Sequence, residues 1–412
     1  MSTPKTTPTR VLRPAVALGG AALVATLAAA NAPSVAAEPA STGRPARCTS
    51  SVPFTSGTEG YTGFRIPAVV ATRSGTLLAF AEGRQSGLGD AGNIDTVLKR
   101  STDGGCTWGP LQVVHDSGAN TSGNPAPVVT ATGRVVLLTT YNGGTATESA
   151  IMRGEVPPEQ SRRVFVQYSD DEGATWTAPR EITDSAKAAN WRWYATGPGH
   201  AVRLTRGPHR GRLVVPANHS IAPPAGSPDL GTEARYYGGH SLYSDDDGQT
   251  WRIGYVDDNP DGVVNVNETT LTELPDGRLY LNTREHNGSA PGNRADAYSV
   301  DGGQNLQLPF RPQATIVGPV VQGSVLQLGG APDAPLLYSG PADPAARAAL
   351  TLRVSTDEGA TWRPSLALSG LPAGYSDLVQ LDRDTVGVLY ETGNFGPYET
   401  ITFRRVPVRD LR

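Results

Sequence analysis

An eight-residue turn pattern that recurs along the chain constrains its fold more than any other feature. The skeleton Ser-x-Asp-x-Gly-x-Thr-Trp occupies Ser101–Trp108, Ser169–Trp176, Ser244–Trp251 and Ser355–Trp362. A fifth copy, from Ser299, keeps Ser, Asp and Gly but lacks Thr and Trp. Consecutive copies begin 68, 75, 55 and 56 residues apart. A period of about 60 residues indicates one supersecondary unit per copy.

Each residue type in this pattern, which we call the Asp turn, has a structural role. Asp and Ser side chains bind nearby backbone amides, Gly adopts backbone angles that other residues resist, and Trp packs the turn against its own sheet. An alternating apolar segment precedes each full copy: TVLKR, RVFVQY, HSLY and LTLRV. Such alternation is typical of a β-strand. We therefore expect a strand–turn–strand unit whose Asp carboxylates are structural rather than catalytic.

The composition favours a turn-rich β protein, with 48 Gly, 34 Pro and only 18% charged residues. A unit of about 60 residues holds four short strands, the size of one propeller blade, and the chain from Tyr61 to Leu411 has room for about six. We predict an all-β fold, a six-bladed β-propeller of four-stranded antiparallel sheets. The N-terminal or C-terminal strand should complete one blade and close the ring. One or two helical turns are expected between Asp184 and Asn190.

The N-terminus has the pattern of a secretory signal. Three basic residues among the first thirteen precede an apolar run from Ala15 to Ala30 and a small-residue end. We predict a signal peptide over residues 1–37, a flexible leader over 38–50 and the propeller over 51–412. A membrane anchor is the alternative, but the run is short and rich in Ala and Gly. The mature protein is expected to be secreted, without membrane association.

Charge and cysteine content limit the partners. A net charge of -4 lacks the basic footprint of a nucleic-acid-binding protein. None of the six histidines has metal-ligand spacing, and we expect no metal, no cofactor and a monomer. Export would allow a disulfide between Cys48 and Cys106. Two buried thiols are the alternative, and the sequence leaves both open.

One short motif, over residues 64–67, carries a resemblance to a known family. In Phe64-Arg65-Ile66-Pro67 an arginine lies in an apolar strand, where a buried charge needs a partner. A solvated or salt-bridged edge arginine is the alternative. Together with the four Asp turns, this motif resembles the bacterial and animal exo-sialidases, which are six-bladed propellers. The resemblance extends from about Tyr61 to Glu391 and implies a glycoside hydrolase.

The resemblance implies three arginines that hold the carboxylate of sialic acid. Arg65 is the first, Arg284 at the end of LNTR is the second, and Arg347 is the third. Arg353 competes for the third role but lies in the strand that enters the last Asp turn, whereas Arg347 lies in a loop. A planar guanidinium grips a carboxylate through two parallel bonds. We expect the three guanidinium groups to converge at one end of the central channel of the propeller.

The catalytic residues implied by the resemblance are Asp90, Tyr375 and Glu268. Asp90 lies in a Gly-rich loop and resembles the acid/base, with Asp95 as a competitor in the following strand. Tyr375 resembles the nucleophile, with Glu268 as its base. Sialidases are an exception to the usual pair of carboxylates, since a neutral phenol avoids the repulsion that a carboxylate would meet beside the carboxylate of the sugar. Alternatively, Tyr375 is a packed core aromatic and Glu268 a surface acid.

Supporting roles follow from the same resemblance. Arg84 resembles a further substrate contact, and Glu391 matches the carboxylate that steadies Arg65. The stretch NWRWYATGPGH over 190–200 resembles a loop that lines the pocket, where Trp193 or Tyr194 either shapes the pocket or packs in the core.

The sequence thus predicts a secreted, retaining exo-α-sialidase that acts on sialylated glycoproteins, glycolipids and oligosaccharides. Two alternatives stay open. A trans-sialidase would move the sugar to an acceptor. A non-catalytic sialic-acid-binding lectin would keep the arginines but would need neither Asp90 nor Tyr375.

Overall fold

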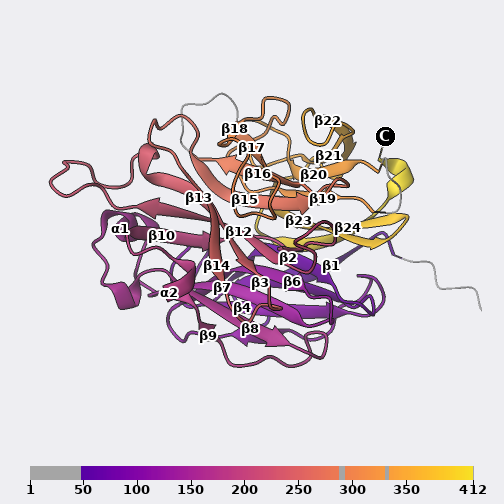
Figure 1. The fold of residues 1–412 in the computed structure, drawn as a ribbon. Helices are drawn as coiled ribbons and strands as arrows, with labels where there is room; N and C mark the ends of the chain where they lie inside the picture. The colour runs from indigo at the N-terminus through magenta and orange to yellow at the C-terminus, as the bar shows by residue number, and fades with distance from the viewer. Residues whose placement is uncertain (1–47, 287–292, 330–333, 412) are drawn as a thin grey trace, which may run out of the picture. The chain divides into compact units, whose positions relative to one another are not determined.

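β-Strands carry nearly all of the regular structure (Figure 1). The computed structural model describes residues 48–286, 293–329 and 334–411, all within the unit that spans 47–412. The predicted signal peptide and the predicted leader up to residue 47 lie outside the described residues. Within this part of the chain, 25 strands form five sheets.

Four of the five sheets are separate blades of four or five strands. The blade that contains the N-terminal strand is β1 (Ser50–Thr55), β25 (Thr400–Pro407), β24 (Thr385–Thr392) and β23 (Ala373–Asp382). The second is β15 (Val266–Glu273), β16 (Leu279–Glu285), β17 (Arg294–Ser299) and β18 (Arg311–Pro312). The third is β19 (Ser324–Gln327), β20 (Leu336–Pro341), β21 (Leu350–Ser355) and β22 (Arg363–Ala367). The fourth is β10 (Trp191–Thr196), β12 (Leu213–Ile221), β13 (Tyr237–Ser244) and β14 (Arg252–Asp258), with β11 (Val202–Arg203) on β12.

The fifth sheet has eight strands. Its main path is β2 (Gly63–Ala71), β3 (Leu77–Arg84), β4 (Ile94–Ser101), β6 (Thr121–Val129), β7 (Val135–Asn142), β8 (Arg163–Ser169) and β9 (Arg180–Glu181), with β5 (Gln112–His115) on β4. The helical elements are α1 (Glu148–Arg153), α2 (Thr183–Ala186), η1 (Pro158–Gln160), η2 (Ala234–Tyr236) and η3 (Val408–Asp410). The position of α2 agrees with the helical turn expected between Asp184 and Asn190.

The prediction of six four-stranded blades is wrong. The described strands form four separate blades and one eight-stranded sheet. That sheet is continuous because β4 and β6 pair in parallel at Ile94 and Thr121, where the Ile94 amide also donates to the Asn120 carbonyl at 3.1 Å. The Asp-turn repeat marks where strands end and carries no information about such a lateral pair.

The Asp turns have the predicted structural role. In the first copy, Asp103 Oδ1 accepts hydrogen bonds from Ser101 Oγ at 2.7 Å and Thr107 N at 2.9 Å, while Oδ2 accepts from Thr107 Oγ1 at 2.7 Å. Burial opposes ionisation of Asp103, but these bonds together outweigh it and lower the pKa of Asp103 to about 2. In the fifth copy, Asn305 replaces Thr, and its side-chain amide donates to Asp301 at 2.8 Å. The turn therefore persists where the sequence pattern is incomplete.

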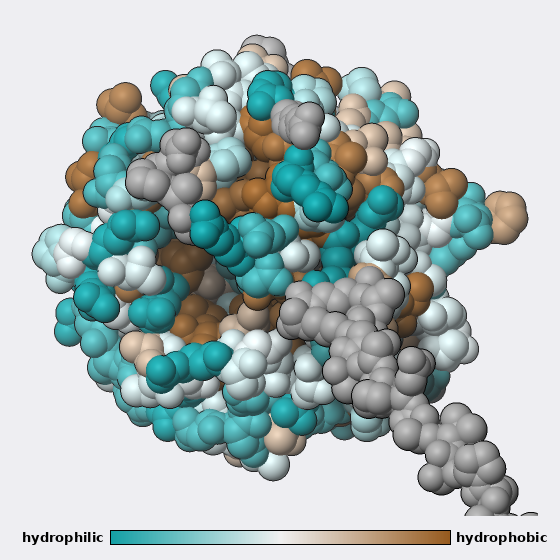
Figure 2. Space-filling model, turned by 90° about the vertical axis from the view of Figure 1, so that its right-hand side faces the viewer, coloured by the Kyte–Doolittle hydropathy of each residue, from teal (hydrophilic) through white to brown (hydrophobic). Residues whose placement is uncertain are grey.

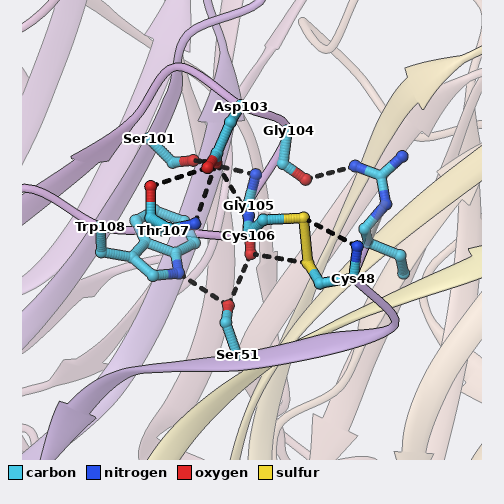
Figure 3. Close-up of a disulfide and its surroundings, with 10 residues drawn as sticks. Cys48, Ser51, Ser101, Asp103, Gly104, Gly105, Cys106, Thr107 and Trp108 are labelled. Atoms are coloured by element: carbon cyan, nitrogen blue, oxygen red, sulfur yellow. Dashed lines mark hydrogen bonds between the residues drawn. A yellow bond between two sulfur atoms is a disulfide. The ribbon is translucent and has the colours of Figure 1, made fainter. Parts of the chain in front are cut away.

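The N-terminal strand completes the C-terminal blade, as the sequence predicted. β1 pairs with β25, and a disulfide joins Cys48, two residues before β1, to Cys106 in the first Asp turn (Figure 3). Ser51 Oγ donates to the Gly105 carbonyl at 2.5 Å and accepts from Trp108 Nε1 at 2.8 Å. The disulfide is confirmed, and it links the segment just before β1 to the first Asp turn, which belongs to the eight-stranded sheet.

Hydrophobic cores lie between neighbouring sheets. One cluster joins Leu138 of β7 to Val215 of β12. Another joins Phe64 of β2 to Phe403 of β25. On the face of the molecule in Figure 2, hydrophilic side chains cover much of the surface and hydrophobic residues show between them.

The inner strands contact one another in a closed series, β2–β6–β11–β15–β19–β23 and back to β2. This arrangement places residues that are hundreds of positions apart around one axis, and the candidate site lies there.

Candidate active site

A cavity of about 320 Å³ contains most of the predicted site residues. Seven of the eight line it, and they are Arg65, Arg84, Asp90, Glu268, Arg284, Arg347 and Tyr375. The eighth, Glu391, is fully buried and binds Arg65. These residues come from β2, β3, β15, β16, β23, β24 and two loops. The fold thus brings together the eight residues that the resemblance selected for catalysis, substrate binding and support of Arg65.

Local backbone irregularities place several of these side chains. Shifts in strand register occur beside five residues that line the cavity: Arg65, Asn124, Trp193, Glu268 and Tyr375. A β-bulge re-aims the side chains next to it and is frequent beside active sites. Ile66, within the first of these bulges, has a φ of 59°, which a branched residue rarely adopts. The bulges therefore direct side chains from different strands into one cavity.

Tyr375 and Glu268 form a direct hydrogen-bonded pair in the cavity. The phenol donates to Glu268 Oε1 at 2.6 Å, and Arg284 Nη1 donates to Glu268 Oε2 at 2.8 Å and to the phenol oxygen at 3.1 Å. Burial, followed by the charge of Glu268, raises the pKa of Tyr375, although the nearby arginines oppose the shift. The phenol is therefore protonated at neutral pH, with a carboxylate placed to accept its proton.

The three predicted arginines surround Tyr375. The Cζ atoms of Arg65 and Arg347 lie 5.0 and 5.6 Å from the centre of its ring, and Arg284 contacts its hydroxyl. Arg353 does not line the cavity and donates to the Val317 carbonyl. The loop position that favoured Arg347 over Arg353 in the sequence is the one that reaches the cavity.

Glu391 orients Arg65 and the neighbouring backbone. Its carboxylate accepts from Arg65 Nε at 3.1 Å and Nη2 at 3.3 Å. It also accepts from the backbone amides of Ile66 and Tyr375, each at 2.9 Å. Burial opposes ionisation of Arg65, but the charge of Glu391, together with Tyr375, Tyr398 and Asp90, outweighs it, so the pKa of Arg65 is raised. One carboxylate thus ties β2 to β23 where both enter the cavity.

Asp90 lies at the mouth of the cavity, with 70% of its side chain exposed. Its Oδ1 atom is 2.8 Å from Arg84 Nη2 and 3.7 Å from Arg65 Nη1. Desolvation opposes ionisation, but Arg84 and then Arg65 outweigh it and lower the pKa of Asp90. Asp95 lies elsewhere, since it is buried on β4 and accepts from the Tyr61 hydroxyl at 2.7 Å. Of the two candidate acids, only Asp90 lines the cavity.

Sequence reasoning missed Tyr398. Its hydroxyl accepts from Arg347 Nη1 at 2.7 Å, and Arg65 Cζ lies 4.1 Å from the centre of its ring. Tyr398 therefore fixes two of the three arginines at once. It follows an irregular loop with no repeated pattern, so no sequence signal indicated this role.

Arg162, Asn124 and Glu148, which sequence reasoning also missed, line the cavity as well. Arg162 stacks on Trp193, with its Cζ 3.7 Å from the ring, and donates to Asn124 Oδ1 at 3.2 Å. Burial lowers the pKa of Arg162 to about 10 despite the charge of Glu148, and burial raises the pKa of Glu148. Trp193 was one of two residues proposed for this wall, and it lines the cavity, whereas Tyr194 is fully buried in a hydrophobic cluster.

Some buried polar atoms of residues that line the cavity have no hydrogen-bond partner. They are both side-chain amide atoms of Asn218, Nδ1 of His286 and Nε of Arg162. Buried polar groups are normally paired, so these atoms suit a polar ligand.

Among the described residues, no group of three or more His, Cys, Asp or Glu side chains could hold a metal ion. The helices in the same part of the chain are all too short or too polar to span a membrane.

Comparisons with known proteins agree with this site. A family model described as a BNR repeat-like domain matches residues 75–388. A sialidase from Micromonospora viridifaciens is 32% identical over 351 residues, which cover 82% of this chain and 51% of that protein. An exo-alpha-sialidase from Aspergillus fumigatus is 31% identical over 375 residues, which cover 84% of each chain.

Solved structures show the same fold. A Hadza microbial sialidase has a TM-score of 0.73 and 27% identity, covering 87% of this chain and 68% of that one. A leech intramolecular trans-sialidase has a TM-score of 0.71 at 18% identity, covering 87% of this chain and 70% of that one, a likeness of fold alone. This chain thus spans about half of the Micromonospora protein and most of the Aspergillus one. From the family model and these relatives, the chain belongs to the sialidase family of glycoside hydrolases.

Proposed function

We propose that this chain is a retaining exo-α-sialidase that hydrolyses terminal sialic acid from glycoproteins, glycolipids and oligosaccharides. The observation that carries the proposal is the 2.6 Å hydrogen bond from Tyr375 to Glu268 beside three guanidinium groups in one cavity. A sialoside has a carboxylate on its reacting carbon. Arginines would hold that carboxylate through charge-assisted bonds, while the neutral phenol approaches without like-charge repulsion.

In the first step, the Tyr375 oxygen attacks the anomeric carbon and its proton passes to Glu268. The bond from that carbon to the leaving oxygen breaks, and Asp90 protonates the departing group. Asp90 is ionised at neutral pH in the free protein, and Arg84 and Arg65 lower its pKa further despite desolvation. A substrate carboxylate on Arg65 would offset part of that positive field, so substrate binding favours the protonated form of Asp90 that the step requires.

In the second step, Asp90 takes a proton from water, and the resulting hydroxide attacks the anomeric carbon. The bond to Tyr375 breaks, and the phenol regains its proton from Glu268. Two displacements at one carbon give net retention. The polar atoms of Asn218, His286 and Arg162 that have no hydrogen-bond partner would bind polar substituents of the sugar.

Release of 4-methylumbelliferone from its α-sialoside tests the activity. We expect turnover by the wild type and at least a 100-fold loss in Tyr375→Phe and Asp90→Ala, since positioned proton transfer alone contributes about 10²–10⁴-fold. Tyr243→Phe, outside the cavity, is the matched control. A wild type without turnover, or two active variants, would refute the proposal. Proton NMR of the first released sugar should show the α-anomer.

Hydrolysis is proposed over transfer and over binding alone. Addition of lactose separates the first two, because a trans-sialidase would form sialyllactose in preference to free sialic acid. A lectin would bind sialosides without turnover and would not need Tyr375 or Asp90.

We further propose that the protein is exported and monomeric. The Cys48–Cys106 disulfide supports export, because disulfides persist in oxidising compartments. N-terminal sequencing of the secreted form and size-exclusion chromatography test these two points.

A further inference from the structure

A second cavity, of about 600 Å³, lies further along the inner strands. Its volume is in the range of known small-molecule sites. Four strands line both cavities, with three or four positions between a residue of the first and a residue of the second. These pairs are Arg65 and Val69 on β2, Asn124 and Val128 on β6, Glu268 and Thr272 on β15, and Tyr375 and Leu378 on β23. At about 3.3 Å per residue, the two cavities are roughly 10–13 Å apart along each strand.

The carboxylate of Asp377 adjoins the second cavity but is already fully used. Its side chain is 1% exposed, and it accepts hydrogen bonds from Val69 N at 2.8 Å, His200 N at 3.0 Å and Ser324 Oγ at 2.8 Å. His200 Nδ1 also lies 2.7 Å from it. Val69 and His200 both line the second cavity. This acid therefore holds inner segments together and does not neutralise a cation in the cavity.

Three arginines line the second cavity. Arg73 lies in the turn after β2, Arg203 on β11 and Arg210 in the loop after β11, and no Asp or Glu of the described chain lines the cavity with them. Arg73 Nη1 donates to the Ala131 carbonyl at 3.0 Å. Neither Arg203 nor Arg210 forms an ion pair with another residue that the structure describes. The guanidinium groups therefore give this cavity an uncompensated positive charge.

Carboxylates close to these arginines in the chain are bonded elsewhere. Glu273 directly follows Thr272 on β15, and it accepts from the backbone amides of Thr205 at 2.8 Å and Arg206 at 3.0 Å. Glu172 accepts from Ser74 Oγ, next to Arg73, at 2.7 Å. Each acid thus fixes a turn, and an anion from solution is the partner that the arginines lack.

Most of the other residues that line the second cavity are aliphatic. They include Val69, Val128, Val202, Leu326 and Leu378. Val202 and Leu326 are only half-buried, so part of this aliphatic wall is open to solvent. A small inorganic anion would leave the wall in water, and a neutral apolar molecule would leave the guanidinium groups without a partner. A ligand that has both an anionic group and an aliphatic body satisfies both parts of the cavity.

We propose that this second cavity binds aliphatic carboxylates, with the carboxylate on Arg203 and Arg210 and the chain against the aliphatic wall. The site is separate from the candidate active site, and it does not depend on the sialidase activity. Octanoate is a suitable probe, because acetate has the same charged group without the chain and 1-octanol has the same chain without the charge.

Isothermal titration calorimetry of the whole protein measures the dissociation constants of these three probes. Octanoate should bind at least tenfold more tightly than acetate, because burial of about two of its six additional methylenes suffices for that difference. It should also bind more tightly than 1-octanol. The Arg203→Gln, Arg210→Gln double variant should raise the dissociation constant of octanoate about five- to tenfold, the range for two solvent-exposed ion pairs. Arg206→Gln is the matched control, since Arg206 is exposed in the same segment but does not line the cavity.

Arg347→Ala separates the second cavity from the candidate active site, whose arginines also attract carboxylates. It should leave the affinity for octanoate unchanged. Loss of binding in Arg347→Ala, with normal binding in the double variant, would place octanoate in the candidate active site and refute the proposal. Equal affinities for octanoate and acetate, or for octanoate and 1-octanol, would also refute it. Unchanged melting temperatures verify that the variants are folded, so weaker binding in the double variant alone reports the loss of the two guanidinium groups.

Discussion

The phenol of Tyr375 and the carboxylate of Glu268 are 107 positions apart in the chain and share a 2.6 Å hydrogen bond. Tyr375 lies on β23 and Glu268 on β15, in two different blades. Each residue lies beside a shift in strand register. The pair is therefore a product of blade packing and bulge geometry, and its properties lead to the first prediction.

Glu268→Gln should abolish most of the activity while leaving the fold intact. Glutamine can accept the phenolic hydrogen bond but cannot take up the proton, so we expect a loss in kcat of about 10²–10⁴-fold. Steady-state kinetics with the fluorogenic sialoside measures the loss, and the melting temperature serves as the control. Activity within tenfold of the wild type would assign the role of base to another group.

Arg347→Ala and Arg65→Ala should differ in their effect on stability. Arg347 is half-buried and binds the Tyr398 hydroxyl and the Val320 carbonyl, so its loss should weaken substrate binding by about 2–5 kcal/mol with little unfolding. Arg65→Ala should weaken binding equally but also leave Glu391 buried without its cation. Urea denaturation and KM together separate the two cases. Equal stability of the two variants would contradict the role of Glu391.

Glu391→Leu with Arg65 retained should be among the most destabilising single substitutions. It removes the acceptor of four hydrogen bonds and leaves the buried guanidinium of Arg65 with only the exposed Asp90, at 3.7 Å, as an anionic partner. Breaking a buried ion pair from one side costs about 3–5 kcal/mol. Chemical denaturation should show this loss, whereas substitution of the exposed pair partner Glu155 should change the unfolding free energy very little.

Removal of the disulfide should loosen the closure between β1 and the first Asp turn. The Cys48→Ser, Cys106→Ser double variant frees a segment of 58 residues, for which the chain-entropy treatment predicts a loss of about 4 kcal/mol. The melting temperature should fall, and a reducing agent should lower that of the wild type but not of the variant. If the melting temperature of the wild type is unchanged under conditions that reduce the disulfide, the packing of β1 against the first Asp turn does not depend on that bond.

Stability should decline as pH rises, through one buried pair. His200 Nδ1 lies 2.7 Å from Asp377, whose carboxylate also accepts from Val69 N on β2 and Ser324 Oγ on β19, each at 2.8 Å. Burial opposes the charge of His200, but Asp377 outweighs it and raises the pKa of His200. A raised pKa stabilises the fold fully below the unfolded-state value and loses that contribution as pH rises through the folded-state value. The unfolding free energy of the wild type should therefore fall more steeply above neutral pH than that of His200→Gln. Parallel curves would exclude the pair as the cause.

The repeated turn was readable from the sequence because it is a local structure. Asp103 and Ser101 bind backbone amides within four residues, so identity and spacing alone determine the turn and the strand before it. The motif Phe64-Arg65-Ile66-Pro67 added the family, and with it the candidate residues that line the cavity. The disulfide was one of two open possibilities, because cysteine content permits a bond without placing two sulfurs together.

Other features depended on tertiary structure. The parallel pair of Ile94 and Thr121, which merges strands into an eight-stranded sheet, is a lateral contact that no turn repeat encodes. Tyr398 and Arg162 reach the cavity from segments without a recurring pattern, and only the packing of strands from separate sheets brings them there. Local hydrogen bonds are set by neighbours in the chain, and this sequence determined its turns, strands and family by itself. The grouping of strands into separate sheets and the full set of residues that line the cavity depend on contacts between distant segments, and only the folded chain decides these.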